Sequence, residues 1–88
     1  MIAQIKFDER DFQEEIMCHI KEATFNYDTK KVVYRLPDGN CTSMTGAIIF
    51  GKKINPYVKA ISVFAGEKLI SQYIRQSGGD WKSIAFGG

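Results

Sequence analysis

The chain of 88 residues contains few side chains that could carry out catalysis. His19 is its only histidine, so a catalytic dyad or a metal site with an imidazole would have to use it. Cys18 is adjacent in sequence, but neighbouring residues of a helix project about 100° apart and do not meet. Acidic residues nearby on the same predicted helix also disfavour a thiolate at Cys18. Cys41 could approach His19 only through tertiary folding, and no oxyanion loop accompanies them. We therefore expect no catalytic residue and no enzyme.

The sequence also lacks recognisable motifs for metals and cofactors. Cys18, His19 and Cys41 do not have the local chelating spacing of structural zinc sites, and no glycine-rich nucleotide-binding motif occurs. The two cysteines form no C-x-x-C pair, which favours a reducing compartment. No apolar run reaches the roughly 18 residues of a membrane helix, and the acidic residues after Phe7 are unlike a signal peptide. The sequence predicts a cytoplasmic protein with no metal, no cofactor and no membrane association.

Charge is distributed unevenly along the chain. Residues 1–28 carry three basic and seven acidic side chains, whereas residues 29–88 carry nine basic and three acidic ones. The formal net charge of +2 therefore conceals an acidic first third and a basic remainder. Such an asymmetry indicates a positive surface that attracts phosphates or an acidic protein. The pI of about 8.6 is lower than is usual for nucleic-acid-binding domains.

The basic residues that could form this surface lie in two segments, with tyrosines among them. The candidate binding residues are Lys30, Lys31, Arg35, Lys52, Lys53, Tyr57 and Lys59, and the aromatic residues Tyr34 and Trp81 are interleaved with them. Lysines on turns and edge strands also keep proteins soluble, so a merely solvated surface is the competing interpretation. A homo-oligomer is a further possibility, because the acidic helix of one copy could meet the basic sheet of another.

Several secondary-structure elements must position these residues. Alternating apolar residues predict a strand over Met1–Phe7, and Asp8 is a suitable N-cap for a helix that continues to Ala23. β-Branched and aromatic residues then predict a meander, separated by turn residues, with strands over Thr24–Tyr27, Lys31–Leu36 and Thr42–Phe50. In the second of these strands, the core-facing residues would be Val32, Tyr34 and Leu36.

The segment from Asn55 to Ser77 permits two interpretations. A single helix would place the apolar residues of its two halves on opposite sides, so the chain has to change at Gly66. We expect a strand over Tyr57–Phe64 and a helix over Glu67–Ser77, with two helices kinked at Gly66 as the alternative. Asp80–Phe86 would form a short last strand. Residues 1–88 are thus predicted to be one small α+β domain, an antiparallel β-meander sheet with two helices packed on one face.

The last three residues, Phe86-Gly87-Gly88, suggest a further possibility. A terminal diglycine resembles the tail of ubiquitin-like sulfur carriers and modifiers, in which two glycines give the carboxylate a slender reach. The resemblance implies that a partner enzyme adenylates the terminal carboxylate.

The sequence favours a small non-enzymatic binding protein, such as an inhibitor, an adaptor or an accessory subunit. It would dock an acidic protein partner through a basic, tyrosine-containing surface, with electrostatic attraction speeding encounter and aromatic anchors adding affinity. A nucleic-acid-binding module that uses the same lysines is the first alternative, and a ubiquitin-like carrier with a C-terminal diglycine is the second.

Overall fold

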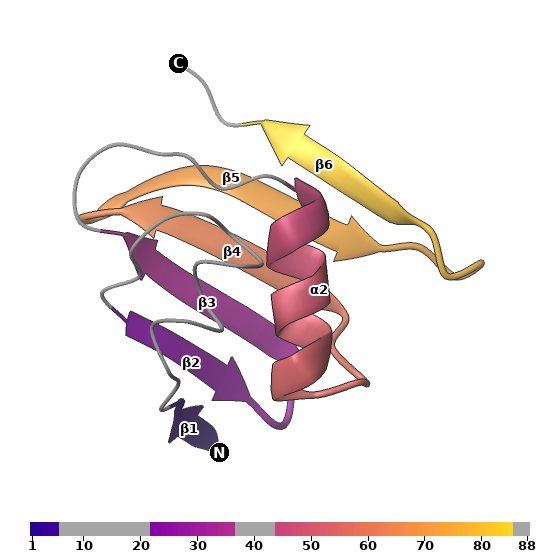
Figure 1. The fold of residues 1–88 in the computed structure, drawn as a ribbon, viewed down its shortest axis with the longest axis horizontal. Helices are drawn as coiled ribbons and strands as arrows, with labels where there is room; N and C mark the ends of the chain where they lie inside the picture. Colours follow the sequence, from indigo (N-terminus) through magenta and orange to yellow (C-terminus); the bar gives the residue numbers. More distant parts are fainter. Residues whose placement is uncertain (6–21, 37–43, 86–88) are drawn as a thin grey trace.

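The structure is a computed structural model that describes residues 1–5, 22–36 and 44–85. These residues form one six-stranded sheet and one helix, arranged as shown in Figure 1. In chain order the elements are β1 (Ile2–Gln4), β2 (Glu22–Asn26), β3 (Lys31–Leu36), α2 (Met44–Ile54), β4 (Ala60–Ala65), β5 (Lys68–Arg75) and β6 (Trp81–Ala85). No helix in this described part of the chain is long and apolar enough to cross a membrane.

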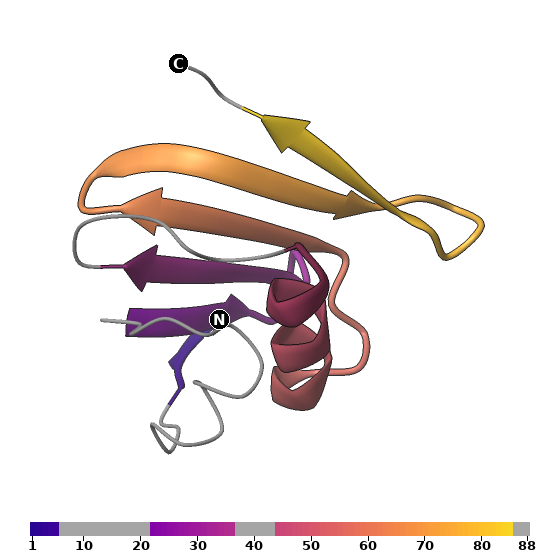
Figure 2. The ribbon, with the colours of Figure 1, turned by 45° about the horizontal axis from the view of Figure 1, so that its top comes forward.

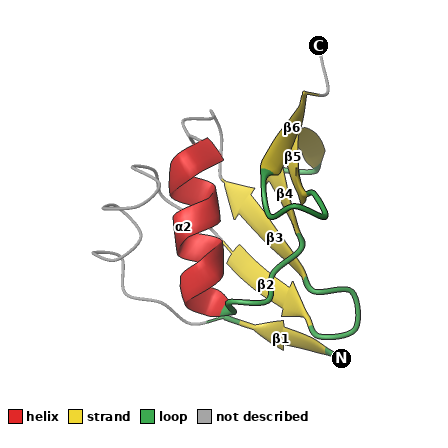
Figure 3. Ribbon diagram, turned by 90° about the vertical axis from the view of Figure 1, so that its right-hand side faces the viewer, coloured by secondary structure: helices red, strands yellow, loops and turns green. Residues whose placement is uncertain are grey.

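The sheet is mixed, and its strands lie side by side in the order in which they occur in the chain. Four of the neighbouring pairs are antiparallel, whereas β3 and β4 run parallel. A parallel pair requires a crossover connection, and α2 provides it. The helix packs across one face of the sheet, as the views in Figures 2 and 3 show.

The hydrophobic core lies between α2 and the sheet. The strands β2 and β3 alternate between buried and half-buried residues, so that one face of each strand supplies the core. Val32, Tyr34 and Leu36 are buried, as their alternation in the sequence predicted. Across the sheet the register places Phe25, Val32, Ile61 and Tyr73 in one row, and all four are buried.

Close contact between α2 and the sheet depends on small residues and one buried hydrogen bond. Ala47, Phe50, Gly51 and Ile54 recur at the spacing of one helix face. A Cβ atom at Gly51 would lie 3.0 Å from Ile61 Cδ1 and 3.4 Å from the Tyr34 hydroxyl oxygen, so glycine allows this approach. The Tyr34 hydroxyl donates a hydrogen bond of 3.0 Å to the carbonyl oxygen of Ala47. Burial raises the pKa of Tyr34 well above its ordinary value.

Two of the predicted elements are wrong in kind. The predicted strand over Thr42–Phe50 is wrong, because α2 begins at Met44 and its apolar residues follow helical rather than alternating spacing. The predicted helix over Glu67–Ser77 is also wrong, because this segment contains β5. The alternative of two helices kinked at Gly66 is wrong for the same reason. The fold is α+β, but its described part holds one helix and a mixed sheet, rather than two helices and an antiparallel meander.

A β-bulge explains why β5 looked helical in the sequence. The register shifts between Val63 and Phe64, which pair with Ser71 and Leu69, so that Ile70 has no partner. Ile70 and Tyr73 therefore both contribute to the core although they are three residues apart, a spacing that resembles a helix face. The predicted change at Gly66 is confirmed: this glycine has φ 62° in the turn between β4 and β5.

The remaining predicted elements correspond to strands. The predictions over Lys31–Leu36, Tyr57–Phe64 and Asp80–Phe86 contain all or most of β3, β4 and β6. Glu22 and Ala23 belong to β2, so the predicted first helix is wrong at its last residues. The rest of that helix, with Cys18 and His19, lies outside the described residues, as do Cys41 and the terminal diglycine.

We expect Tyr34→Phe to lower the free energy of unfolding at neutral pH by about 1 kcal/mol, because the carbonyl oxygen of Ala47 loses its buried donor. Urea denaturation measures this change. Tyr57→Phe is the matched control, since Tyr57 is 70% exposed. Equal effects of the two substitutions would show that the buried hydrogen bond contributes nothing.

Alkaline pH should reduce the difference between the wild type and Tyr34→Phe. The pKa of Tyr34 is raised in the folded state, so its contribution to stability is complete below the unfolded pKa of about 10 and is lost as the pH rises above it. Denaturation midpoints measured from neutral pH to about pH 11 should therefore converge for the two proteins. A constant difference over this range would contradict the burial of the hydroxyl.

Candidate functional site

Most of the predicted binding residues gather at one end of the sheet. Because β3 and β4 are parallel, both begin at this end, and α2 has to finish there as well. The strands β2 and β5 end at the same place, which faces the viewer in Figure 3. We call this region the basic end and define it by the cationic residues Lys30, Lys31, Lys52, Lys53, Lys59 and Arg75.

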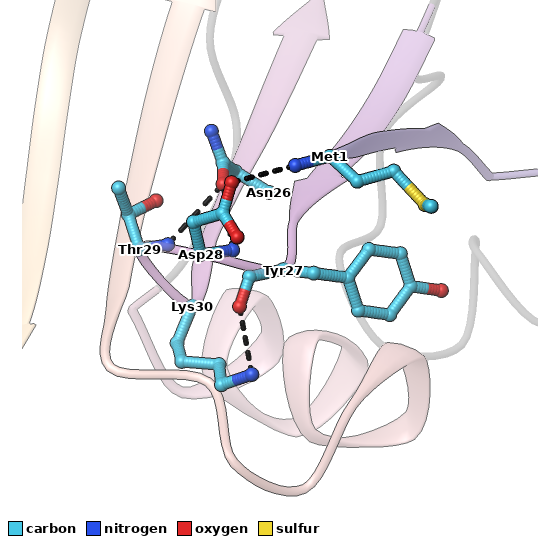
Figure 4. Close-up of polar contacts among 6 residues, drawn as sticks. All are labelled: Met1, Asn26, Tyr27, Asp28, Thr29 and Lys30. Atoms are coloured by element: carbon cyan, nitrogen blue, oxygen red, sulfur yellow. Dashed lines mark hydrogen bonds and ion pairs between the residues drawn. The ribbon is translucent and has the colours of Figure 1, made fainter.

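The turn between β2 and β3 is held by the side chain of Asn26, as Figure 4 shows. The Asn26 Oδ1 atom accepts hydrogen bonds from the backbone amides of Asp28 at 2.9 Å and Thr29 at 3.2 Å. Lys30 closes the turn with φ 58°, a left-handed conformation that is unfavourable for a lysine. Its ammonium group donates a hydrogen bond of 2.7 Å to the carbonyl oxygen of Tyr27. The turn therefore fixes both the backbone and the side chain of Lys30.

The carboxylate of Asp28 in this turn is directed to the amino terminus. Its Oδ2 atom lies 2.7 Å from the Met1 ammonium nitrogen, and both groups are exposed. The hydrogen bond and the charge of this ammonium lower the pKa of Asp28. The charge of Lys30 also lowers the pKa of Asp28, to a smaller extent, so this carboxylate offsets part of the positive charge at the β2–β3 turn.

A second asparagine orders the loop between α2 and β4. The Oδ1 atom of Asn55 accepts a hydrogen bond of 2.8 Å from the Tyr57 amide, and the Val58 amide donates to the Asn55 carbonyl at 3.1 Å. Val58 is buried, which anchors the loop to the core. Tyr57 is consequently held on the surface with 70% of its area exposed.

The last turn of α2 carries Lys52 and Lys53, both of which are exposed. Cations at the C-terminus of a helix interact favourably with its dipole, so these residues also stabilise the helix. Lys59 follows the loop, and its amide donates a hydrogen bond of 2.8 Å to the carbonyl oxygen of Lys30. Two predicted lysines from separate segments of the chain, Lys30 and Lys59, are thus neighbours in the fold, and α2 ends shortly before Lys59.

Arg75 is a member of the basic end that the sequence did not predict. Its amide donates a hydrogen bond of 2.9 Å to the carbonyl oxygen of Lys59, and it ends β5. The predicted helix over this segment separated Arg75 from the lysines. Gly78 and Gly79, which follow the predicted helix over Glu67–Ser77, form the turn of the β5–β6 hairpin, with Gly79 at φ 95°. Reading them as a hairpin signal would have placed Arg75 correctly.

Arg35 does not join the basic end. It lies near the opposite end of β3, where its Nε atom is 3.9 Å from a carboxylate oxygen of Glu22. Its guanidinium carbon lies 4.7 Å from the centre of the Phe64 ring, and Nη1 donates a hydrogen bond of 3.2 Å to the Gly66 carbonyl. These contacts assign Arg35 a role in holding the sheet and the β4–β5 turn together.

The aromatic residues near the lysines differ in their exposure. Tyr34 is fully buried and cannot contribute to a binding surface, and Trp81 is half-buried against the core. Tyr27, which the sequence did not predict, is 43% exposed beside the β2–β3 turn. Its ring packs edge-on against Phe25, with the ring centroids 5.0 Å apart. Tyr27 and Tyr57 are therefore the exposed aromatic residues among those described next to the lysines.

The basic end combines several positive charges over a short distance. Adjacent strands are about 4.8 Å apart, so the backbones at Lys30, Lys59 and Arg75 lie within roughly 10 Å, close to the screening length of physiological salt. No carboxylate of the described residues lies within ion-pair distance of Lys52, Lys59 or Arg75. In the same part of the chain, no three His, Cys, Asp or Glu side chains are grouped to hold a metal ion. This arrangement is suited to binding anions.

Comparison of the chain with protein-family models, with curated proteins and with solved structures finds no match. The function is therefore inferred from the residues and their geometry.

We expect Asn55→Ala to lower the free energy of unfolding by about 1 kcal/mol, because the Tyr57 amide loses its acceptor and the loop becomes less ordered. Asn55→Asp keeps an acceptor oxygen at this position and should retain most of the stability. Urea denaturation of the three proteins tests the role of the loop. If the aspartate variant were as unstable as the alanine variant, the hydrogen bond would not be what orders it.

Proposed function

We propose that this protein is a non-enzymatic binding protein that docks an acidic protein partner through its basic end. The observation that carries the proposal is the convergence of cations from four separate segments at one end of the sheet, beside an exposed tyrosine. Positive charges that lie within a screening length add their fields, which speeds encounter with an acidic surface and fixes its orientation.

The tyrosines support a protein partner in particular. Tyr57 and Tyr27 present large, stiff side chains at the surface, and such residues provide much of the affinity of protein interfaces. The formal net charge of only +2 also supports a protein partner over nucleic acid, because nucleic-acid-binding domains are usually more basic. The asparagine-ordered turns support the same function, since a surface that is already ordered loses less entropy on binding.

Charge reversal in α2 tests this proposal with poly-L-glutamate as the acidic probe. We expect Lys52→Glu to weaken binding at low salt by roughly two- to fivefold, and the pair Lys52→Glu with Lys53→Glu to weaken it further. Lys68→Glu is the matched control, because Lys68 is an exposed lysine at the other end of the sheet, where β5 begins. Fluorescence anisotropy at several salt concentrations measures the affinities, and the differences should diminish as salt increases.

Two results would overturn the proposal. Equal effects of Lys52→Glu and Lys68→Glu would show that the basic end has no special role. A single-stranded oligonucleotide could instead bind more tightly than poly-L-glutamate, with the same dependence on Lys52. That result would indicate nucleic acid, rather than an acidic protein, as the partner. In that case the slope of log affinity against log salt should decrease by about one for each lysine removed from the phosphate contacts.

A further inference from the structure

An open surface cavity of about 330 Å³ lies between the first residues of the β5–β6 turn and Lys59, the residue before β4. Its walls are formed by the residues Lys59, Arg75, Gln76 and Ser77. Each of these side chains offers hydrogen-bond donors, and two of them carry a positive charge. Among the residues that the structure describes, no carboxylate lines the cavity. The acidic residue in this hairpin is Asp80, which is exposed and follows the turn.

The two cations of the cavity lie directly opposite each other across the sheet. β4 and β5 are antiparallel with Ala60 opposite Ile74, and the Arg75 amide donates to the Lys59 carbonyl at 2.9 Å. Residues in this relation have Cβ atoms about 5 Å apart, and like charges there destabilise the pair. Among the described residues no anion relieves this repulsion. An anion bound between the two side chains would do so.

The surrounding backbone holds the cavity in shape. The Gln76 amide donates a hydrogen bond of 2.6 Å to the Asp80 carbonyl, and the Gly79 amide donates one of 2.9 Å to the Gln76 carbonyl. These bonds order the turn of the hairpin beside Gln76 and Ser77. Trp81 lies opposite Arg75 in the register and packs against the hydrophobic core, which anchors the second strand of the hairpin. The backbone that carries Gln76 and Ser77 is therefore ordered before a ligand arrives.

We infer that the cavity between Lys59 and Arg75 binds a dianionic oxyanion, of which a phosphomonoester group is the common biological form. Two adjacent cations match two negative charges, and the planar guanidinium of Arg75 suits two oxygens of one phosphoryl group. The side-chain amide of Gln76 and the hydroxyl of Ser77 offer further donors for the remaining oxygens. This site shares Lys59 and Arg75 with the basic end but does not depend on a protein partner.

A nitrogen–proton correlation NMR titration of the whole chain with inorganic phosphate tests the site, with sodium chloride keeping the ionic strength constant. We expect saturable shifts of the amide signals of residues 75–78. Lys59→Gln and Arg75→Gln should each weaken the affinity roughly tenfold or more, because each removes a charged hydrogen-bond donor. Arg75→Lys should recover only part of the loss. Lys68→Gln replaces an exposed lysine at the start of β5, far from the cavity, and should leave the phosphate affinity unchanged.

The pH dependence separates dianion binding from general attraction. Inorganic phosphate changes from dianion to monoanion at about pH 7, roughly one unit above a phosphomonoester, so its affinity should fall from about pH 8 to about pH 5.5. Sulfate keeps both charges over this range, and its affinity should therefore stay constant. Acetate, with one charge, should bind more weakly than either. The same titration with O-phosphoserine and with a nucleoside 5′-monophosphate identifies the kind of molecule that carries the phosphoryl group. A compound that binds more tightly than inorganic phosphate must make contacts beyond that group.

Three results would overturn this inference. They are shifts that do not saturate, shifts equally large at Lys52 and Lys53, and an affinity unaffected by Lys59→Gln and Arg75→Gln. Equal affinities for acetate and phosphate at about pH 7.5 would exclude a preference for dianions. Since Lys52 and Lys53 do not line the cavity, failure here leaves the poly-L-glutamate result unchanged, and the two proposals fail independently.

Discussion

The parallel pairing of β3 with β4 is the constraint on which the rest of the molecule depends. Two parallel strands begin at the same end of a sheet, so the chain has to return to that end after it leaves β3. The helix α2 makes this return and finishes beside the starts of both strands. Lysines that are up to 29 positions apart in the sequence, from Lys30 to Lys59, consequently become neighbours. The basic end is a product of topology.

The position of the returning helix is set by its packing against the sheet. Gly51 allows α2 to approach Ile61 and Tyr34 closely, and the hydroxyl of Tyr34 bonds to the helix backbone at Ala47. Beyond the helix, Val58 inserts into the core and fixes where the loop enters β4. A buried cluster on one side of the sheet thereby determines the positions of exposed cations at its end. Any change that shifts α2 should also shift Lys52 and Lys53 relative to Lys59.

Local sequence patterns predicted those elements whose spacing depends only on neighbours along the chain. The strand β3 has alternating Val32, Tyr34 and Leu36 between clear turn residues, and its prediction was confirmed. The helix α2 was missed because β-branched and apolar residues near Ile48 suggested a strand, while the crossover that makes it helical depends on a strand further along the chain. In β5, the bulge at Ile70 gave a strand the spacing of a helix. In both segments, pairing between strands decided the structure, so the local sequence pattern predicted the wrong element.

The candidate site was predictable to the same extent. The lysines of the β2–β3 turn and of the end of α2 were evident from composition, because cations in turns and at helix ends are exposed under many arrangements. The prediction included Arg35, which does not lie at the basic end, and omitted Arg75, which does. The locations of both residues depend on strand register. Arg35 found Glu22 and Phe64 as partners, whereas Arg75 came to lie beside Lys59. Composition identifies the charges of a surface, but register determines which of them lie together.

Two features of the basic end are unfavourable for stability and need a reason. Lys30 adopts a left-handed conformation in which glycine or asparagine would be more stable. Lys59 and Arg75 lie opposite each other although like charges in such positions repel. Elsewhere in the described sheet, Arg35 shows that an arginine of this fold can be paired with a carboxylate and an aromatic ring. Local costs of this kind cluster at functional sites, where a ligand offsets them. The concentration of both costs at one end therefore supports a role in binding anions more strongly than a role in solubility, for which dispersed lysines suffice.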